Sequence, residues 1–327
     1  MLDQPPSGTS TSELWESIAP RMNDDLIALQ RILEDRAASD DSLRPPLVHI
    51  IGPPRSGTTL ALQVLSSSLD IGYITNTAAA FWRAPAVGVI LSRHLHQRDR
   101  ASGFESEYGR TQGPQEPHEF GRFWLELLGY RSMTHGDRVH VPIDWDHVRK
   151  TLMSITWAWQ APVAVKTFVG VWHLADLMAA VPGSIAVRVR RDPVDTTLSL
   201  LRMREARLGS QPGWVSVVPR ACLTAGLTTP IEQVACQVVS FESEIDQGLV
   251  PIQRERIIEV TYADLVSSPS RFTSSVQRAL QSLSCPVSRM ATPTLSPRPS
   301  PVRDERRAAV ESIIERLHAE SSTPGAR

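Results

Sequence analysis

Apolar and polar positions along this chain follow two alternating patterns. Short aliphatic runs, continuous or alternating with polar residues, predict strands at 47–51, 161–166, 184–190 and 256–262. Apolar residues recurring every three or four positions predict helices at 12–38, 60–70, 172–181, 193–201, 230–247 and 304–320. Because strands that alternate with helices usually form a parallel sheet covered on both faces, we expect an α/β fold.

The chain between the first two predicted strands differs from the rest. Residues 71–160 carry many Trp, Tyr and His residues and several Gly/Pro breaks, with helices expected at 78–97, 117–129 and 144–158. We interpret 71–160 as a helical cap inserted after the first strand–helix unit. We expect a loose tail at 1–11, rich in Pro, Ser and Thr, and a single domain over 12–327 that includes this cap.

The first predicted strand leads into a glycine-containing turn and then a helix. Gly52 and Gly57 frame the turn, and Ser56, Thr58 and Thr59 lie within or just after it. Free backbone N–H groups and the positive end of a helix dipole converge where a strand and tight turn feed a helix. The loop therefore predicts a phosphate site, although a capped helix start without a ligand would show similar residues.

The sequence of this loop departs from the Walker A pattern, because Thr58 occupies the position of the usual lysine. The run Pro54-Arg55-Ser56-Gly57-Thr58-Thr59 instead resembles the 5′-phosphosulfate loop of sulfotransferases that use 3′-phosphoadenosine 5′-phosphosulfate (PAPS). The branch it resembles includes the tyrosylprotein sulfotransferases and many bacterial sulfotransferases. The resemblance implies a P-loop-like nucleotide site in which Pro54, Arg55 and the amides of residues 56–59 hold the 5′-phosphate.

A second motif about 130 residues later extends this resemblance. Arg191-Asp192-Pro193 follows a predicted strand, and Ser199 lies eight residues after Arg191. This pattern is similar to the 3′-phosphate motif of the family, which implies that Arg191 and Ser199 bind that phosphate. Guanidinium and hydroxyl groups suit such a ligand. Tyr262 lies in a run similar to a late strand of the family and is expected near the nucleotide, although Ala263 replaces the usual Glu.

The resemblance also assigns catalytic groups. Lys166 ends a predicted strand, as a lysine does in many family members, and would neutralise charge on the transferring group; the chain has only one other lysine, Lys150. Arg55 would stabilise the leaving oxygen. No metal is implied, and no metal-ligand spacing is evident.

The general base is where the sequence departs from the family. The branch often carries a Glu one helix and turn after the loop, but this chain has Thr75-Asn76-Thr77. The best substitute stretch lies at 115–121, where His118 and Glu119 are the preferred candidates. Acidic residues in the first turn of a helix would be an equally simple explanation. Acceptor contacts are expected from the cap, at Phe81, Trp82, Glu116, Phe123 and Trp124.

Composition adds limits to this interpretation. A net charge of −1 gives no reason to expect nucleic-acid or membrane binding. Cys222, Cys236 and Cys285 are few and far apart, so we expect neither a disulfide framework nor a zinc site. We see no signal peptide and no stretch near the ~18 apolar residues that span a bilayer. These features predict a cytoplasmic protein and leave its oligomeric state open.

The sequence therefore predicts a PAPS-dependent sulfotransferase that acts on a hydroxyl of a small molecule or glycan and releases adenosine 3′,5′-bisphosphate (PAP). Two alternatives remain at this point. A P-loop kinase would consume ATP with magnesium, and a catalytically silent homologue would bind the nucleotide without turnover.

Overall fold

The computed structural model of the chain describes residues 11–40, 45–95, 104, 106, 109, 111–139, 141–291, 293, 295 and 304–321. The predicted tail at 1–11 lies outside these residues except for Thr11. Among the described helices, none has both the length and the apolar character that crossing a bilayer requires.

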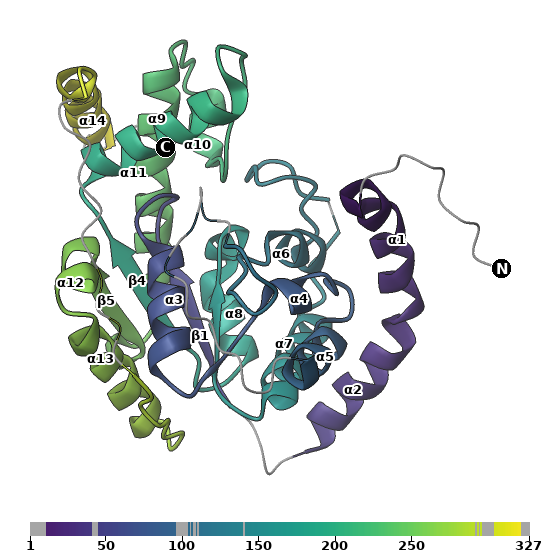
Figure 1. The fold of residues 1–327 in the computed structure, drawn as a ribbon. Coiled ribbons are helices and arrows are strands. Elements are labelled where there is room, and N and C mark those ends of the chain that lie inside the picture. Colours follow the sequence, from purple (N-terminus) through teal and green to yellow (C-terminus); the bar gives the residue numbers. More distant parts are fainter. Residues whose placement is uncertain are drawn as a thin grey trace.

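The described strands form a parallel sheet at the centre of the molecule (Figure 1). The strands are β1 (Leu47–Ile51), β2 (Gly72–Tyr73), β3 (Val163–Lys166), β4 (Ile185–Arg190) and β5 (Ile257–Thr261). Their order across the sheet is β2-β3-β1-β4-β5, so β1 lies in the middle with β3 and β4 beside it. The expected α/β fold is confirmed; β2 is an additional two-residue edge strand that the apolar pattern did not predict.

Helices surround the sheet. They are α1 (Thr11–Asp25), α2 (Ile27–Ser39), α3 (Thr58–Ser68), α4 (Asn76–Ala79), α5 (Pro85–Leu95), α6 (Gly121–Leu128), α7 (Trp145–Trp159), α8 (Leu174–Ala180), α9 (Pro193–Leu208), α10 (Arg220–Thr224), α11 (Pro230–Leu249), α12 (Tyr262–Ser267), α13 (Pro269–Ser282) and α14 (Arg307–Ser321), with 3₁₀ turns η1 (Val169–His173) and η2 (Arg254–Arg256).

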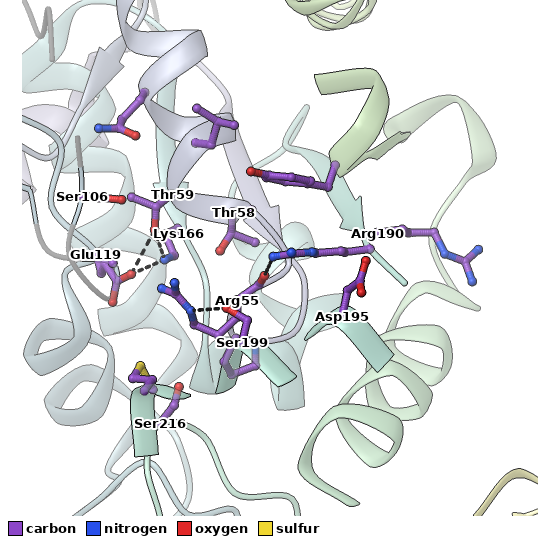
Figure 2. Close-up of a pocket in the computed structure, with 18 of the residues that line it drawn as sticks. Arg55, Thr58, Thr59, Ser106, Glu119, Lys166, Arg190, Asp195, Ser199 and Ser216 are labelled. Carbon is purple, nitrogen blue, oxygen red and sulfur yellow. Dashed lines mark hydrogen bonds and ion pairs between the residues drawn. The ribbon is translucent and has the colours of Figure 1, made fainter. Parts of the chain in front are cut away.

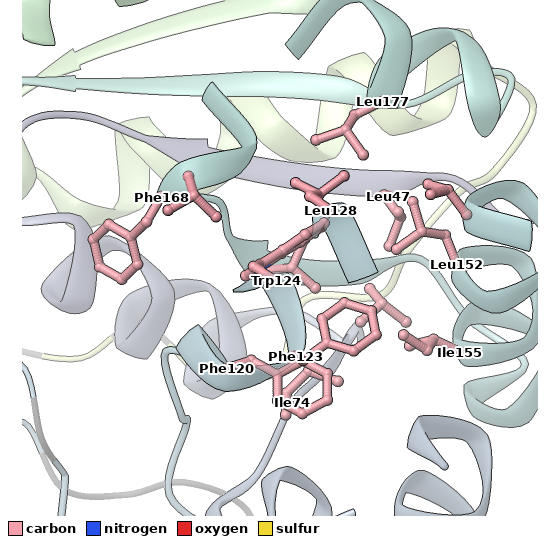
Figure 3. Close-up of a cluster of buried hydrophobic side chains, with 14 of the residues drawn as sticks. Leu47, Ile74, Phe120, Phe123, Trp124, Leu128, Leu152, Ile155, Phe168 and Leu177 are labelled. Carbon is pink, nitrogen blue, oxygen red and sulfur yellow. The ribbon is translucent and has the colours of Figure 1, made fainter. Parts of the chain in front are cut away.

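Alternate residues of β1 point into two separate cores. Val48 and Ile50 pack with residues of α3 and α13 on one face. Leu47 and Ile51 pack on the other face, in a cluster that includes Trp124 (Figure 3). All five residues of β1 are buried, which explains why its sequence is continuously apolar apart from His49.

Several helix boundaries differ from the sequence expectation. The predicted helix at 12–38 is two helices, α1 and α2, separated at Leu26, and the one at 78–97 becomes α4 and α5. The helix expected at 117–129 begins only at Gly121, because Phe120 before it adopts a left-handed backbone with φ of 55°. His118 and Glu119 therefore lie in the approach to α6 rather than in its first turn.

The expectation that the cysteines form no disulfide was wrong. Cys222 of α10 and Cys236 of α11 form a disulfide, whereas Cys285 is a free thiol. The two helices bring together cysteines that are 14 residues apart in sequence. The cysteine pattern consequently gives no support for a reducing compartment.

Candidate active site

The turn from β1 into α3 has the features of an anion site. Gly57 is the N-cap of α3 with φ of 109°, and no side chain caps the helix. The first amides of α3 therefore lack intrahelical acceptors, as at any helix N-terminus. A Cβ on Gly57 would lie 2.6 Å from the ring of Tyr262, so glycine is required for this close approach.

Other residues of the loop divide into two groups. Pro54, Arg55, Thr58 and Thr59 line the cleft described below. Ser56 does not: its side chain is fully buried, and its backbone N–H donates to the carbonyl of Pro53 at 3.1 Å. The expectation that Ser56 contributes its amide to a phosphate is therefore not supported by this geometry.

The second motif lies directly against the loop. Arg191 Nη1 donates to the backbone carbonyl of Arg55 at 3.0 Å, although 136 residues separate them. The guanidinium of Arg191 also lies 4.7 Å from the ring centroid of Tyr262. Arg55 Nε in turn donates to Ser199 Oγ at 3.2 Å (Figure 2). The structure thus brings Arg55, Arg191, Ser199 and Tyr262 to one place.

Local structure explains how Arg191 and Ser199 are positioned. Asp192 caps α9 by accepting a hydrogen bond from the amide of Asp195. Arg191 therefore lies in the short connection between the end of β4 and the start of α9. Ser199 follows about two helical turns later, close enough to the loop to reach Arg55.

A buried charged cluster lies beside the loop. Lys166, at the end of β3, is 3% exposed and donates from Nζ to Thr59 Oγ1 at 2.8 Å. It also forms an ion pair with Glu119, whose Oε1 accepts from Thr59 Oγ1 at 3.2 Å. Burial lowers the pKa of Lys166 from its ordinary value, and the Glu119 carboxylate opposes this shift.

Side chains from many parts of the chain line one cleft of about 1360 Å³, which contains both motifs and the charged cluster. The cationic residues that line it are Arg55, Lys166, Arg190, Arg191, Arg202 and Arg207. Its carboxylates are Glu119, Asp192, Asp195 and Glu259. The excess of cations favours an anionic ligand. In the described part of the chain, no group of three or more His, Cys, Asp or Glu could hold a metal ion.

Several expected acceptor contacts lie elsewhere. Phe81, Trp82, Phe123 and Trp124 are 8%, 6%, 2% and 0% exposed, and none of them lines the described cleft. They pack in the interior instead: Trp82, Phe123 and Trp124 belong to the large core cluster, and Trp124 Nε1 donates to the carbonyl of Lys166 at 2.7 Å. These four aromatic residues of the cap are therefore buried and do not line the cleft.

Two candidates from the 115–121 stretch are also outside the cleft. Glu116 is 5% exposed and does not line it. His118 is exposed, and its Nδ1 accepts a hydrogen bond from the amide of Phe120 at 2.8 Å. Of the carboxylates and imidazole in this stretch, Glu119 is the one that reaches the cleft.

Sequence reasoning missed Met133, Phe168, Met203 and Ser216, which also line the cleft. Met133 lies in the loop after α6 and Phe168 in the segment after β3. Met203 lies on α9, and Ser216 lies in the loop after α9. Phe168 offers a weak signal, because it lies two residues after Lys166. The others carry no recognisable motif.

Comparison with known proteins identifies the family of this chain. Residues 46–282 match the model of the sulfotransferase family. The chain belongs to the sulfotransferase family, as predicted from the two motifs at 54–59 and 191–199. A comparison with curated protein sequences gave no match.

Among solved structures, similar ones are also sulfotransferases. Sulfotransferase STF1 from Mycobacterium tuberculosis H37Rv is 16% identical, with 92% of this chain and 86% of that one covered at a TM-score of 0.48. A sulfotransferase from Alicyclobacillus acidocaldarius is 17% identical, with coverage of 84% and 95% and a TM-score of 0.44. The sulfotransferase domain of the curacin biosynthetic pathway is 15% identical, with coverage of 81% and 80% and a TM-score of 0.43.

Proposed function

We propose that this protein transfers a sulfuryl group from PAPS to a hydroxyl of its acceptor and releases PAP. The observation that carries the proposal is the contact between Arg191 Nη1 and the Arg55 carbonyl at 3.0 Å. It places a guanidinium suited to the 3′-phosphate next to a loop suited to the 5′-phosphate, within one cleft. A nucleotide that carries phosphate only at its 5′ position has no 3′-phosphate for the Arg191 guanidinium to bind.

The residues present fit such a donor. The uncapped start of α3, with the amides of Thr58 and Thr59, would hold the 5′-phosphate. Arg191 and Ser199 would bind the 3′-phosphate through charge-assisted hydrogen bonds. Tyr262 packs against both Gly57 and Arg191, so its ring would lie beside the nucleotide.

The donor supplies a sulfuryl group joined to a phosphate oxygen, and transfer requires mainly alignment and charge neutralisation. The acceptor oxygen forms the new bond to sulfur. The bond from sulfur to the 5′-phosphate oxygen breaks, and this oxygen keeps the electron pair. Arg55, which lies beside Ser199, would stabilise the charge that grows there.

Glu119 is the general base in this proposal. Its carboxylate reaches the cleft and is held by Lys166 and Thr59. Once the anionic sulfuryl group competes for Lys166, the Glu119 carboxylate becomes free to take the proton of the acceptor hydroxyl. Lys166 then neutralises charge on the transferring group.

The test compares nucleotides by their stabilisation of the fold. PAP, adenosine 5′-monophosphate and ATP–magnesium are each added to the purified chain, and thermal unfolding is followed. A ligand present at 100 times its Kd stabilises the folded state by about 2.7 kcal/mol. We expect a clear upward shift in Tm with PAP and a much smaller one with the other two.

Two results would contradict the proposal. One is a larger shift with ATP–magnesium than with PAP, which would favour a kinase. The other is PAP binding without consumption of PAPS in the presence of any hydroxyl acceptor, which would favour a silent homologue.

A further inference from the structure

The cleft is larger than one ligand requires. Its volume of about 1360 Å³ exceeds the range of roughly 300–1,000 Å³ that is usual for small-molecule sites. The phosphate motifs occupy one end, and the Lys166–Glu119 pair marks the point where transfer would occur. The remaining space next to this pair is where an acceptor would lie.

The walls of this remaining space are largely apolar. Phe168 is 7% exposed and belongs to the large core cluster, but it also lines the cleft, and its ring centroid lies 4.4 Å from Lys166 Nζ. Met133 lies close to Gly121, which follows Glu119 by two residues. A Cβ added to Gly121 would be 3.0 Å from the methyl group of Met133. Met203 also lines the cleft and packs in one cluster with Val215, the neighbour of Ser216.

Few polar groups are available among these side chains. Ser106 and Ser216 line the cleft, and each provides one hydroxyl (Figure 2). Glu119 already bonds to Lys166 and Thr59. A sugar presents several hydroxyls, and each one that is desolvated without a partner costs free energy. Thioether and aromatic walls instead suit an apolar body of variable shape.

We infer that the acceptor is a small apolar alcohol, aliphatic or phenolic, rather than a glycan, and that Met133, Phe168 and Met203 determine this specificity. The inference rests on the proposed function and narrows its acceptor class. The hydroxyl would lie beside Glu119, and the apolar body would pack along the two methionines and the phenylalanine.

The test measures acceptor binding to the complex of the chain with PAP, which requires no turnover. Calorimetric titrations use 1-butanol, 1-hexanol and 1-octanol, then 2-naphthol, and methyl β-glucoside as the sugar. We expect Kd to fall by up to about fourfold for each added CH₂ group, as burial of that group in an apolar site predicts. Methyl β-glucoside should bind more weakly than 1-hexanol.

Two variants of Met133 test whether the cleft causes this dependence of the acceptor Kd on chain length. Met133→Gln keeps the length of the side chain and adds polar atoms, so it should flatten the dependence of Kd on chain length while leaving the Kd of PAP unchanged. Met133→Leu should retain the dependence. Met290→Gln is the matched control, because Met290 is 42% exposed and does not line the cleft; it should change neither measurement.

The outcomes separate the two proposals. If PAP does not bind, the proposed function fails and the acceptor assignment fails with it. If PAP binds but the chain-length dependence is absent, or methyl β-glucoside binds more tightly than the alcohols, the acceptor assignment alone is overturned. The same holds if Met133→Gln and Met290→Gln behave alike.

Discussion

The two ends of the cleft are built in different ways. At the end that we propose for the nucleotide, two short stretches of chain, 52–59 and 191–199, supply most of the groups, and each is a turn leading into a helix. At the end that we propose for the acceptor, single side chains come from separate parts of the chain: Glu119, Met133, Phe168 and Ser216. The first arrangement depends on backbone geometry that local sequence determines, whereas the second depends on how distant segments pack.

This difference predicts how each end responds to substitution. Changes at the nucleotide end should weaken binding of PAP, whereas changes at the acceptor end should alter turnover or acceptor affinity. The first two experiments below test this difference between the ends of the cleft. The other two test the stability of the sheet and of the segment that includes α14.

The largest effect is expected for Glu119→Gln. Loss of a general base typically lowers kcat by about 10²–10⁴-fold. The Kd of PAP should change little, because the amide retains the shape of the carboxylate. Steady-state kinetics with PAPS and titration with PAP measure the two quantities. Glu126→Gln is the control, since Glu126 lies on α6 and pairs with Arg83 outside the cleft. An unchanged kcat in Glu119→Gln would mean that the base lies elsewhere.

Arg191→Ala should have the next largest effect. A hydrogen bond to a charged group contributes about 1.5–3 kcal/mol, so PAP should bind roughly 10–100-fold more weakly. Affinity for adenosine 5′-monophosphate should hardly change, because that nucleotide lacks a 3′-phosphate. Calorimetry with both ligands measures the ratio. The neighbouring Arg190→Ala is the control: Arg190 is about half exposed and points away from Arg55 and Ser199 (Figure 2). Equal losses in both variants would contradict the assignment of the second motif.

His49 on β1 provides a test of the buried interior of the sheet. Burial, together with the charge of Arg256, lowers its pKa to about 3, and its Nδ1 hydrogen-bonds to Thr167 Oγ1 at 3.0 Å. The unfolded chain takes up a proton at His49 below pH ~6.5, whereas the folded chain does so only near pH 3. The contribution of His49 to stability is therefore present above pH 6.5 and is lost as the pH falls toward 3.

Between pH 7.5 and 5, this loss should be about 2 kcal/mol. His49→Asn retains a polar atom near the position of Nδ1 but cannot titrate, so its free energy of unfolding should fall less over this interval by about that amount. Urea unfolding at the two pH values measures the difference. Parallel pH profiles for the two proteins would show that His49 does not titrate as its burial predicts.

The smallest effect is expected at α14, which lies outside residues 46–282, the part matched to the family. Asp304, just before this helix, pairs with Arg202 and Arg306, and Arg202 lines the cleft. The hydrogen bond from Arg306 contributes most to lowering the pKa of Asp304 to about 2. The stabilisation is therefore present above pH ~4 and is lost as the pH falls toward 2.

Asp304→Asn should lower the free energy of unfolding at pH 7 by about 1 kcal/mol, since ion pairs near the surface contribute little. The difference from wild type should narrow between pH 4 and pH 2. Chemical unfolding across this range provides the measurement. Glu311→Gln, on the exposed side of α14 and paired with Arg307, should cost about half as much or less. A constant difference at every pH would show that the Asp304 charge is not the cause.

The amino-acid sequence alone determined the α/β class, the parallel sheet and the two motifs to which the proposed function assigns the phosphates. These features depend on local rules: β1 and β4 are read from runs of apolar residues, and Gly57, Asp192 and Pro193 act on the backbone next to them. The boundaries of the cap helices were predicted less accurately. Phe120 has a left-handed backbone, so α6 begins only after it, and the residue type does not predict that conformation.

Only the tertiary structure decided which side chains of the cap face the cleft. An aromatic residue has the same pattern in sequence whether it only packs in the core, as Trp124 does, or also lines the cleft, as Phe168 does. His118 and Glu119 are neighbours in sequence, yet one is exposed outside the cleft and the other pairs with Lys166 inside it. The physical reason is that contacts between residues far apart in sequence set these orientations, and local spacing carries no information about them.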